Sequence, residues 1–144
     1  MKKTALAKYF LFSERDFFIE KSMSERNLRN LISGMKITES LGKLSSEIEN
    51  IAFDSRKVRP EGLFFAIRGE KHDGGTFIKE ALDKGATAII TEASLESLSS
   101  LNIDREKIAL LRTSDSRKSL AIASAKFYEN PSAYLSLTGI TGTN

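Results

Sequence analysis

The stretch that decides the fold is residues 62–91, GLFFAIRGEKHDGGTFIKEALDKGATAIIT. It opens with an apolar run, Leu63 to Ile67, and closes with a second one, Ala86 to Thr91. Short apolar runs bounded by turn residues are typical of strands that are buried on both faces. We therefore predict two core strands in this stretch.

The residues between the two runs predict a loop followed by a helix. Residues 69–75 contain three glycines and no apolar side chain, which favours a loop. Thr76 is then a candidate N-cap, and Gly85 is placed to end the helix. The side chains expected to face inward are Phe77, Ile78, Ala81 and Leu82.

The same alternation continues on both sides. Ile48 to Phe53 predicts a strand before this stretch, and Ile108 to Leu111 predicts one after it. Three further helices are expected. One begins after Ser24, with Leu28, Leu31 and Ile32 inward, and another after Ser94, with Leu95, Leu98 and Leu101 inward. The third begins after Ser114 or Asp115, has Leu120, Ile122, Ala123 and Phe127 inward, and ends near Glu129 before Asn130-Pro131. We expect an α/β fold, with a small mixed, largely parallel sheet flanked by helices and ligand loops at the carboxyl ends of the strands.

Composition narrows the class of protein. The 144 residues suffice for one domain with a core, and the hydrophobic (40%) and charged (28%) fractions are those of a soluble globular protein. The 22 basic residues are scattered among 19 acidic ones, a pattern that argues against a nucleic-acid partner. With no cysteine and no apolar run long enough to span a bilayer, we expect a cytoplasmic monomer without a membrane partner.

The two ends of the chain carry different signals. Residues 1–22 form an aromatic extension that packs on the body or is poorly ordered. At the other end, Tyr134 to Thr138 predicts a strand leading into Gly139-Ile140-Thr141-Gly142-Thr143-Asn144. This ending is half of a phosphate-binding loop, because the lysine and hydroxyl that would complete such a loop do not follow. We expect the chain to be the front piece of a longer nucleotide-using enzyme.

A second polar cluster, Phe53-Asp54-Ser55-Arg56, follows the first predicted strand. It offers an acceptor, a hydroxyl and a guanidinium, a combination suited to holding a polar ligand. The spacing alone favours a simpler interpretation, in which Asp54 and Ser55 bond the local backbone and Arg56 pairs with a carboxylate.

The order of these pieces resembles the Mur ligase family. The resemblance covers residues 27–144 and is carried by Asp-Ser-Arg, Gly-Leu-Phe-Phe-Ala-Ile-Arg-Gly, Asp-Gly, the helix with Ala-Leu, Gly-Ala-Thr-Ala-Ile-Ile and the final Thr-Gly-Thr-Asn. Members of this family are ATP-dependent enzymes that add amino acids to UDP-N-acetylmuramoyl peptides. The Asp-Ser-Arg domain type implies the MurE or MurF branch, and the Thr-Gly-Thr-Asn ending favours MurE.

The resemblance implies an N-terminal domain that binds the UDP part of the substrate. Phe53 and Ser55 match positions that contact UDP, and Glu70, Lys71 and His72 match a loop over the uridine. Ser55 could donate to a phosphate or ribose oxygen, and Lys71 could face the pyrophosphate. His72 is the only histidine, and we expect its backbone to matter more than its imidazole, with no metal site here.

By the same resemblance, Gly142, Thr143 and Asn144 begin the ATP loop, and residues 23–130 are the UDP-binding domain. The intact enzyme would use ATP and Mg²⁺ to phosphorylate the D-glutamate carboxylate of a UDP-N-acetylmuramoyl dipeptide, which the amine of the third amino acid then attacks. No catalytic residue lies in this chain, so we expect no bound cofactor, no ATP hydrolysis, and weak UDP binding if any.

Two alternatives stay open. One is a MurF-type ligase fragment, which would use the same front domain. The other is a non-catalytic module that binds a UDP-sugar or a protein partner. The codons after Asn144 separate them: Gly-Lys-Thr or Gly-Lys-Ser supports a ligase, and a stop supports the module.

Overall fold

The computed structural model describes residues 26–69, 74–136, 138–139 and 141–142. The strands are β1 (Ile37–Leu41), β2 (Asn50–Ala52), β3 (Gly62–Ala66), β4 (Ala86–Thr91) and β5 (Ala109–Thr113). The α-helices are α2 (Leu28–Ile32), α3 (Ile78–Asp83) and α4 (Ser116–Phe127). The 3-10 helices are η1 (Ser55–Lys57), η2 (Gly74–Phe77), η3 (Leu95–Leu101) and η4 (Pro131–Tyr134).

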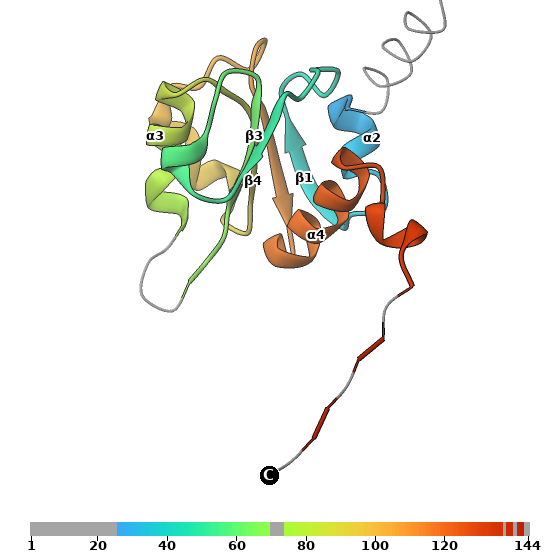
Figure 1. Cartoon of the computed structure of the whole chain (residues 1–144). Helices are drawn as coiled ribbons and strands as arrows, with labels where there is room; N and C mark the ends of the chain where they lie inside the picture. The colour runs from blue at the N-terminus through green and yellow to red at the C-terminus, as the bar shows by residue number, and fades with distance from the viewer. Residues whose placement is uncertain (1–25, 70–73, 137, 140, 143–144) are drawn as a thin grey trace, which may run out of the picture.

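The strands form one sheet in the order β1-β5-β4-β3-β2. Strands β2, β3, β4 and β5 are parallel to one another, and β1 is antiparallel to β5, so the predicted mixed, largely parallel sheet is confirmed. Figure 1 shows α3 on one side of the sheet and α2 with α4 on the other. The predicted strands at Ile48–Phe53, Leu63–Ile67, Ala86–Thr91 and Ile108–Leu111 correspond to β2, β3, β4 and β5.

Strand β3 is buried at all of its positions and separates two apolar cores. Leu63 and Phe65 point to the side covered by α2 and α4, and Phe64 and Ala66 point to the side covered by α3 and η3. This alternation follows from the period of two residues along a strand. The sheet therefore needs a helical layer on each face to exclude water from β3.

Polar side chains cap most of the helices. The Asp115 carboxylate accepts from the Lys118 amide and begins α4, as predicted, and the Ser94 hydroxyl accepts from the Glu96 amide at the start of η3. Leu95 and Leu98 are buried with a spacing of three residues, which matches the period of a 3-10 helix. Helix α2 is capped by Asn27, whereas the proposed cap Ser24 lies outside the described residues.

The predicted start of α3 and the predicted inward orientation of Phe77 were wrong. The α3 helix begins after Phe77 and not after Thr76, because Gly74–Phe77 winds as the 3-10 helix η2 first. The extra turn leaves Phe77 39% exposed, whereas Ile78 and Ala81 are buried as expected. Gly85 follows the C-cap residue Lys84, where it was expected.

The strand predicted at Tyr134–Thr138 is not formed in the described part of the chain. Pro131–Tyr134 is the 3-10 helix η4, and Leu135, Ser136 and Thr138 have no regular structure. Tyr134 is 85% exposed, and the chain leads away from the sheet beyond it (Figure 1). A strand needs a neighbour to satisfy its backbone groups, and none of the five described strands lies alongside this segment.

The sequence patterns did not predict strand β1. Its attachment to β5 depends on a tight turn directly after β1. Gly42 follows β1 with a φ of 87°, and a Cβ built on it would overlap the carbonyl oxygen of Ile108 and lie 3.0 Å from that of Arg105. Gly42 thus allows the turn after β1 to pass directly beside the chain that enters β5.

We predict that Gly42→Ala destabilises the domain by at least about 2 kcal/mol, because the added methyl group both strains φ and collides with backbone atoms. Gly34→Ala is the matched control, since Gly34 has a φ of 85° but open space around its Cβ position. That control should cost only about 1 kcal/mol in urea unfolding. Equal losses for the two variants would contradict the steric argument.

Candidate functional site

The candidate site lies where the parallel strands β2 and β3 end beside each other. Ala52 pairs with Phe64 in the register of these strands, so the residues that follow both strands emerge at the same edge of the sheet. Carboxyl edges of parallel strands are where α/β proteins bind ligands. The structure thus brings the Asp-Ser-Arg cluster close to the base of the 68–74 loop.

Asp54 and Arg56 form a bidentate pair in the turn after β2. The Arg56 Nε donates to Asp54 Oδ1 at 2.9 Å, and its Nη2 donates to Oδ2 at 2.8 Å. The Arg56 amide also donates to Oδ1 at 3.0 Å, so Asp54 caps η1. The side-chain hydrogen bonds from Arg56, followed by the one from its amide, lower the pKa of Asp54 to about 2. Arg56 itself remains 80% exposed along its side chain.

Ser55 turns the opposite way and is buried. Its hydroxyl donates to Glu80 Oε2 at 2.6 Å, and the other oxygen of that carboxylate accepts from Lys84 Nζ at 2.7 Å. These two hydrogen bonds, the one from Lys84 first, lower the pKa of Glu80. Because Glu80 and Lys84 belong to α3 and its C-cap, the chain of contacts ties η1 to this helix.

Phe53 is placed differently from its neighbours. It follows β2 directly, and 64% of its surface is exposed. An exposed aromatic ring beside a polar turn offers a flat apolar wall that could lie against a base. Of the sequence-predicted site residues, Phe53 is therefore accessible, and Ser55 is largely enclosed.

The loop after β3 is closed at its base by a hydrogen bond from the Gly74 amide to the Ile67 carbonyl, 3.1 Å long. A Cβ on Gly74 would lie 2.5 and 2.6 Å from the oxygen and nitrogen of Ile67, so only glycine fits. The side chain of Arg117 in α4 donates to the Arg68 carbonyl at 3.3 Å, at the end of the loop that follows β3. The predicted site residues Glu70, Lys71 and His72 lie outside the described residues.

Of the predicted ATP-loop residues, Gly142 is the one that the structure describes. Gly142 has no atom within 4 Å of its Cβ position, and Thr143 and Asn144 lie outside the described residues. Within the part of the chain that the structure describes, no cluster of three or more His, Asp or Glu could hold a metal ion, and no helix is long and apolar enough to cross a membrane.

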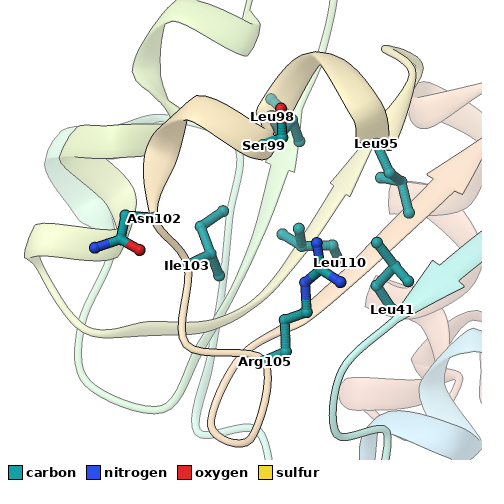
Figure 2. Close-up of a pocket in the computed structure, with 8 residues that line it drawn as sticks. All are labelled: Leu41, Leu95, Leu98, Ser99, Asn102, Ile103, Arg105 and Leu110. Atoms are coloured by element: carbon teal, nitrogen blue, oxygen red, sulfur yellow. The ribbon is translucent and has the colours of Figure 1, made fainter.

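A pocket of about 250 Å³ lies at the other edge of the sheet, between η3 and strands β1 and β5 (Figure 2). Its apolar lining comes from Leu41, Leu95, Leu98, Ile103 and Leu110, and its polar lining from Ser99, Asn102 and Arg105. Of the site residues predicted from the sequence, neither Phe53 nor Ser55 lines it.

Glu80, which accepts from Ser55, and Lys84, which donates to Glu80, were not among the predicted site residues. Their spacing of four residues on a predicted helix indicated a pair with each other. The contact with Ser55 spans 25 positions and had no local signal.

Known proteins are similar to this chain in sequence. Residues 47–128 match the family described as "Mur ligase family, catalytic domain". A UDP-N-acetylmuramoyl-L-alanyl-D-glutamate--2,6-diaminopimelate ligase of Clostridium acetobutylicum is 40% identical over 81% of this chain and 23% of its own length. A UDP-N-acetylmuramyl-tripeptide synthetase of Oceanobacillus iheyensis is 39% identical over 82% of this chain and 23% of its own length.

Among solved structures, a UDP-N-acetylmuramoylalanyl-D-glutamyl-2,6-diaminopimelate--D-alanyl-D-alanyl ligase from Acinetobacter baumannii aligns with a TM-score of 0.50 and 24% identity, over 72% of this chain and 20% of that chain. This likeness supports the α/β fold. The five-stranded sheet with helices on both faces defines an α/β domain. The chain belongs to the Mur ligase family, and it spans about a quarter of the length of the curated relatives it matches.

We predict that Arg56→Met returns the pKa of Asp54 from about 2 toward 3.8, because the lowered value depends on hydrogen bonds from Arg56. The carboxyl carbon of Asp54, followed by NMR across a pH titration, measures this shift. The folded-state pKa is depressed, so the pair stabilises the fold above pH 3.8 and loses that effect as the pH falls through about 2.

Lys57→Met is the control for this titration, since Lys57 acts on Asp54 only through its charge and ranks last among the causes. It should move the pKa of Asp54 much less than Arg56→Met does. An Asp54 that titrates near 3.8 in the unmodified chain would show that the pair is not formed in solution.

Proposed function

We propose that this chain is the UDP-binding part of an ATP-dependent ligase that adds the third amino acid to UDP-N-acetylmuramoyl-L-alanyl-D-glutamate in peptidoglycan synthesis. The observation that carries the proposal is the match to relatives named for that reaction, at 34–46% identity. The geometry supports it, because the Asp-Ser-Arg turn follows β2 and the hydrogen-bonded residues Ile67 and Gly74 follow β3 at the same edge of the sheet.

Substrate binding is assigned to Phe53, Ser55, Glu70, Lys71 and His72 within a domain of residues 23–130. Phe53 offers an exposed ring for the uracil, and Glu70, Lys71 and His72 belong to the loop anchored by Gly74. Pockets of this kind combine an apolar wall with a few polar groups that fix orientation. The substrate class is a UDP-N-acetylmuramoyl dipeptide.

ATP and Mg²⁺ belong to the whole enzyme in this proposal. Gly142, Thr143 and Asn144 would open the ATP loop, and the acyl phosphate chemistry would be carried out by groups that lie outside this chain. A UDP-linked substrate and ATP place the reaction in the cytoplasm, and the lack of cysteine suits a reducing compartment. Relatives named as diaminopimelate ligases and as a tripeptide synthetase favour the MurE branch over MurF.

We predict that UDP, titrated into the ¹⁵N-labelled chain, shifts the amide resonances of Phe53, Ser55 and Glu70 to His72. Uracil and diphosphate would both contribute contacts at this edge, whereas ADP at the same concentration should shift them less because its base differs in shape and in hydrogen-bonding edge. Backbone NMR at increasing UDP concentration measures the effect.

Residues around the η3 pocket, such as Ser99 and Asn102, serve as the internal control and should not respond to UDP. If UDP leaves Phe53, Ser55 and the 70–72 segment unchanged up to millimolar concentration, the assignment of the UDP site is wrong.

A further inference from the structure

The pocket between η3 and strands β1 and β5 has no part in the function proposed above. Its volume of about 250 Å³ lies just under the range of about 300–1,000 Å³ that is common for ligand pockets, so it suits a small molecule. A second hollow of about 470 Å³ shares Leu41, Leu95, Ser99 and Arg105 with it. Because they share these walls, the two hollows adjoin, and together they are called the η3 site below.

The inner part of the η3 site is apolar. Leu98 and Leu110 form the wall toward the core and are 8% and 3% exposed. Leu41 and Ile103 also line the pocket and are only partly buried. A short apolar chain placed here would cover apolar surface that the fold itself leaves open to water.

Three polar side chains that line the η3 site are not used elsewhere in the described part of the chain. Ser99 belongs to η3, and Asn102 and Arg105 belong to the connection from η3 to β5. No hydrogen bond or ion pair between described residues involves these side chains. By contrast, the hydroxyl of Ser97 donates to the Ser94 carbonyl at 2.5 Å. A hydroxyl, an amide and a guanidinium are therefore available to a ligand.

The outer part of the η3 site carries one unpaired charge of each sign. Figure 2 shows the side chain of Arg105 pointing into the pocket. Glu96, in the first turn of η3, lines the adjoining hollow, and its carboxylate has no partner among the described residues. Glu39 lines the same hollow, but its charge is balanced by an ion pair with Arg112. A ligand that matches the unpaired charges has one negative and one positive group.

We propose that the η3 site binds an apolar α-amino acid of about the size of leucine. Its carboxylate would lie against Arg105, its ammonium group against Glu96, and its side chain against Leu98 and Leu110. An α-amino acid carries both charges and the apolar chain on a single carbon, which suits a site that presents both charges beside an apolar wall. Arginine recognises carboxylates well, because its planar fork can form two parallel hydrogen bonds.

The test is an NMR titration of the ¹⁵N-labelled 144-residue chain with L-leucine at neutral pH. We expect leucine to shift the amide resonances of Leu98, Ser99 and Asn102. Three analogues each lack one feature: 4-methylpentanoate has no ammonium group, 3-methylbutylamine has no carboxylate, and L-alanine has no apolar chain. Each should bind about fivefold more weakly than leucine, the loss expected when one exposed contact is removed.

Two variants assign the charges. Arg105→Met should weaken leucine binding about fivefold and leave the binding of 3-methylbutylamine unchanged, since that ligand has no carboxylate to lose. Glu96→Gln should weaken leucine binding by a similar factor and should not weaken that of 4-methylpentanoate. Both side chains are exposed and unpaired among the described residues, so neither change should disturb the fold.

Lys107→Met is the matched control for Arg105→Met. Lys107 is a cation in the same connection, its side chain is 80% exposed, and it lines neither hollow. Its loss should leave leucine binding unchanged. Glu106→Gln serves in the same way for Glu96→Gln, because Glu106 is exposed and lies outside the lining.

The proposal is overturned if leucine at tens of millimolar shifts none of the three amides, or if any of the analogues binds as tightly as leucine. It is also overturned if either control variant weakens binding as much as its partner does. The result does not depend on UDP, whose proposed contacts lie at Phe53 and Ser55, so the two proposals stand or fall separately.

Discussion

Burial of β3 on both faces is the constraint on which the rest of this domain depends. A strand without an exposed position cannot lie at the surface, so it needs a parallel neighbour on each side and a helical layer above and below. Leu63 and Phe65 supply one core, and Phe64 and Ala66 supply the other. Polar side chains next to β3 along the chain therefore lie beyond its two ends.

This confinement explains where the candidate site lies. Strands β2 and β3 run in the same direction and release their following residues at a shared edge. On one strand the turn at Asp54 to Arg56 supplies charge, and on the other the loop closed by Ile67 and Gly74 returns to the sheet. Neighbouring residues of this turn point in different directions: Ser55 faces α3, and Arg56 faces solvent.

The amino-acid sequence predicts the parts of this fold that have a local signature. The apolar runs of β3 and β4 and the Asp115 cap of α4 are found where they were expected, because burial on both faces and capping leave clear patterns. Strand β1 was not predicted because it carries little apolar pattern. Its positions alternate between partly buried and exposed, and the partly buried ones are not all apolar. The strand expected at Tyr134–Thr138 shows the converse, since a suitable pattern does not form a strand without a neighbour.

The candidate site was harder to predict than the fold. The simple interpretation of the Asp-Ser-Arg cluster was right about Asp54, which caps its own turn and pairs with Arg56. It was wrong about Ser55, whose hydroxyl bonds Glu80 and not the local backbone. Arg56 remains exposed to solvent. The partner of Ser55 could not be found from the sequence, because Glu80 meets it only after β3 and α3 have folded together.

The hydrogen bond from Gly74 to Ile67 has a consequence for how such domains diversify. It closes the connection between β3 and η2 at its root, so the sheet and α3 hold their positions independently of the residues carried in between. Insertions, deletions or wholesale exchange of that segment would change what the edge of the sheet recognises while the cost to folding stays small. The hydrogen bond at the root of the loop thus separates the make-up of this segment from the stability of the sheet and α3.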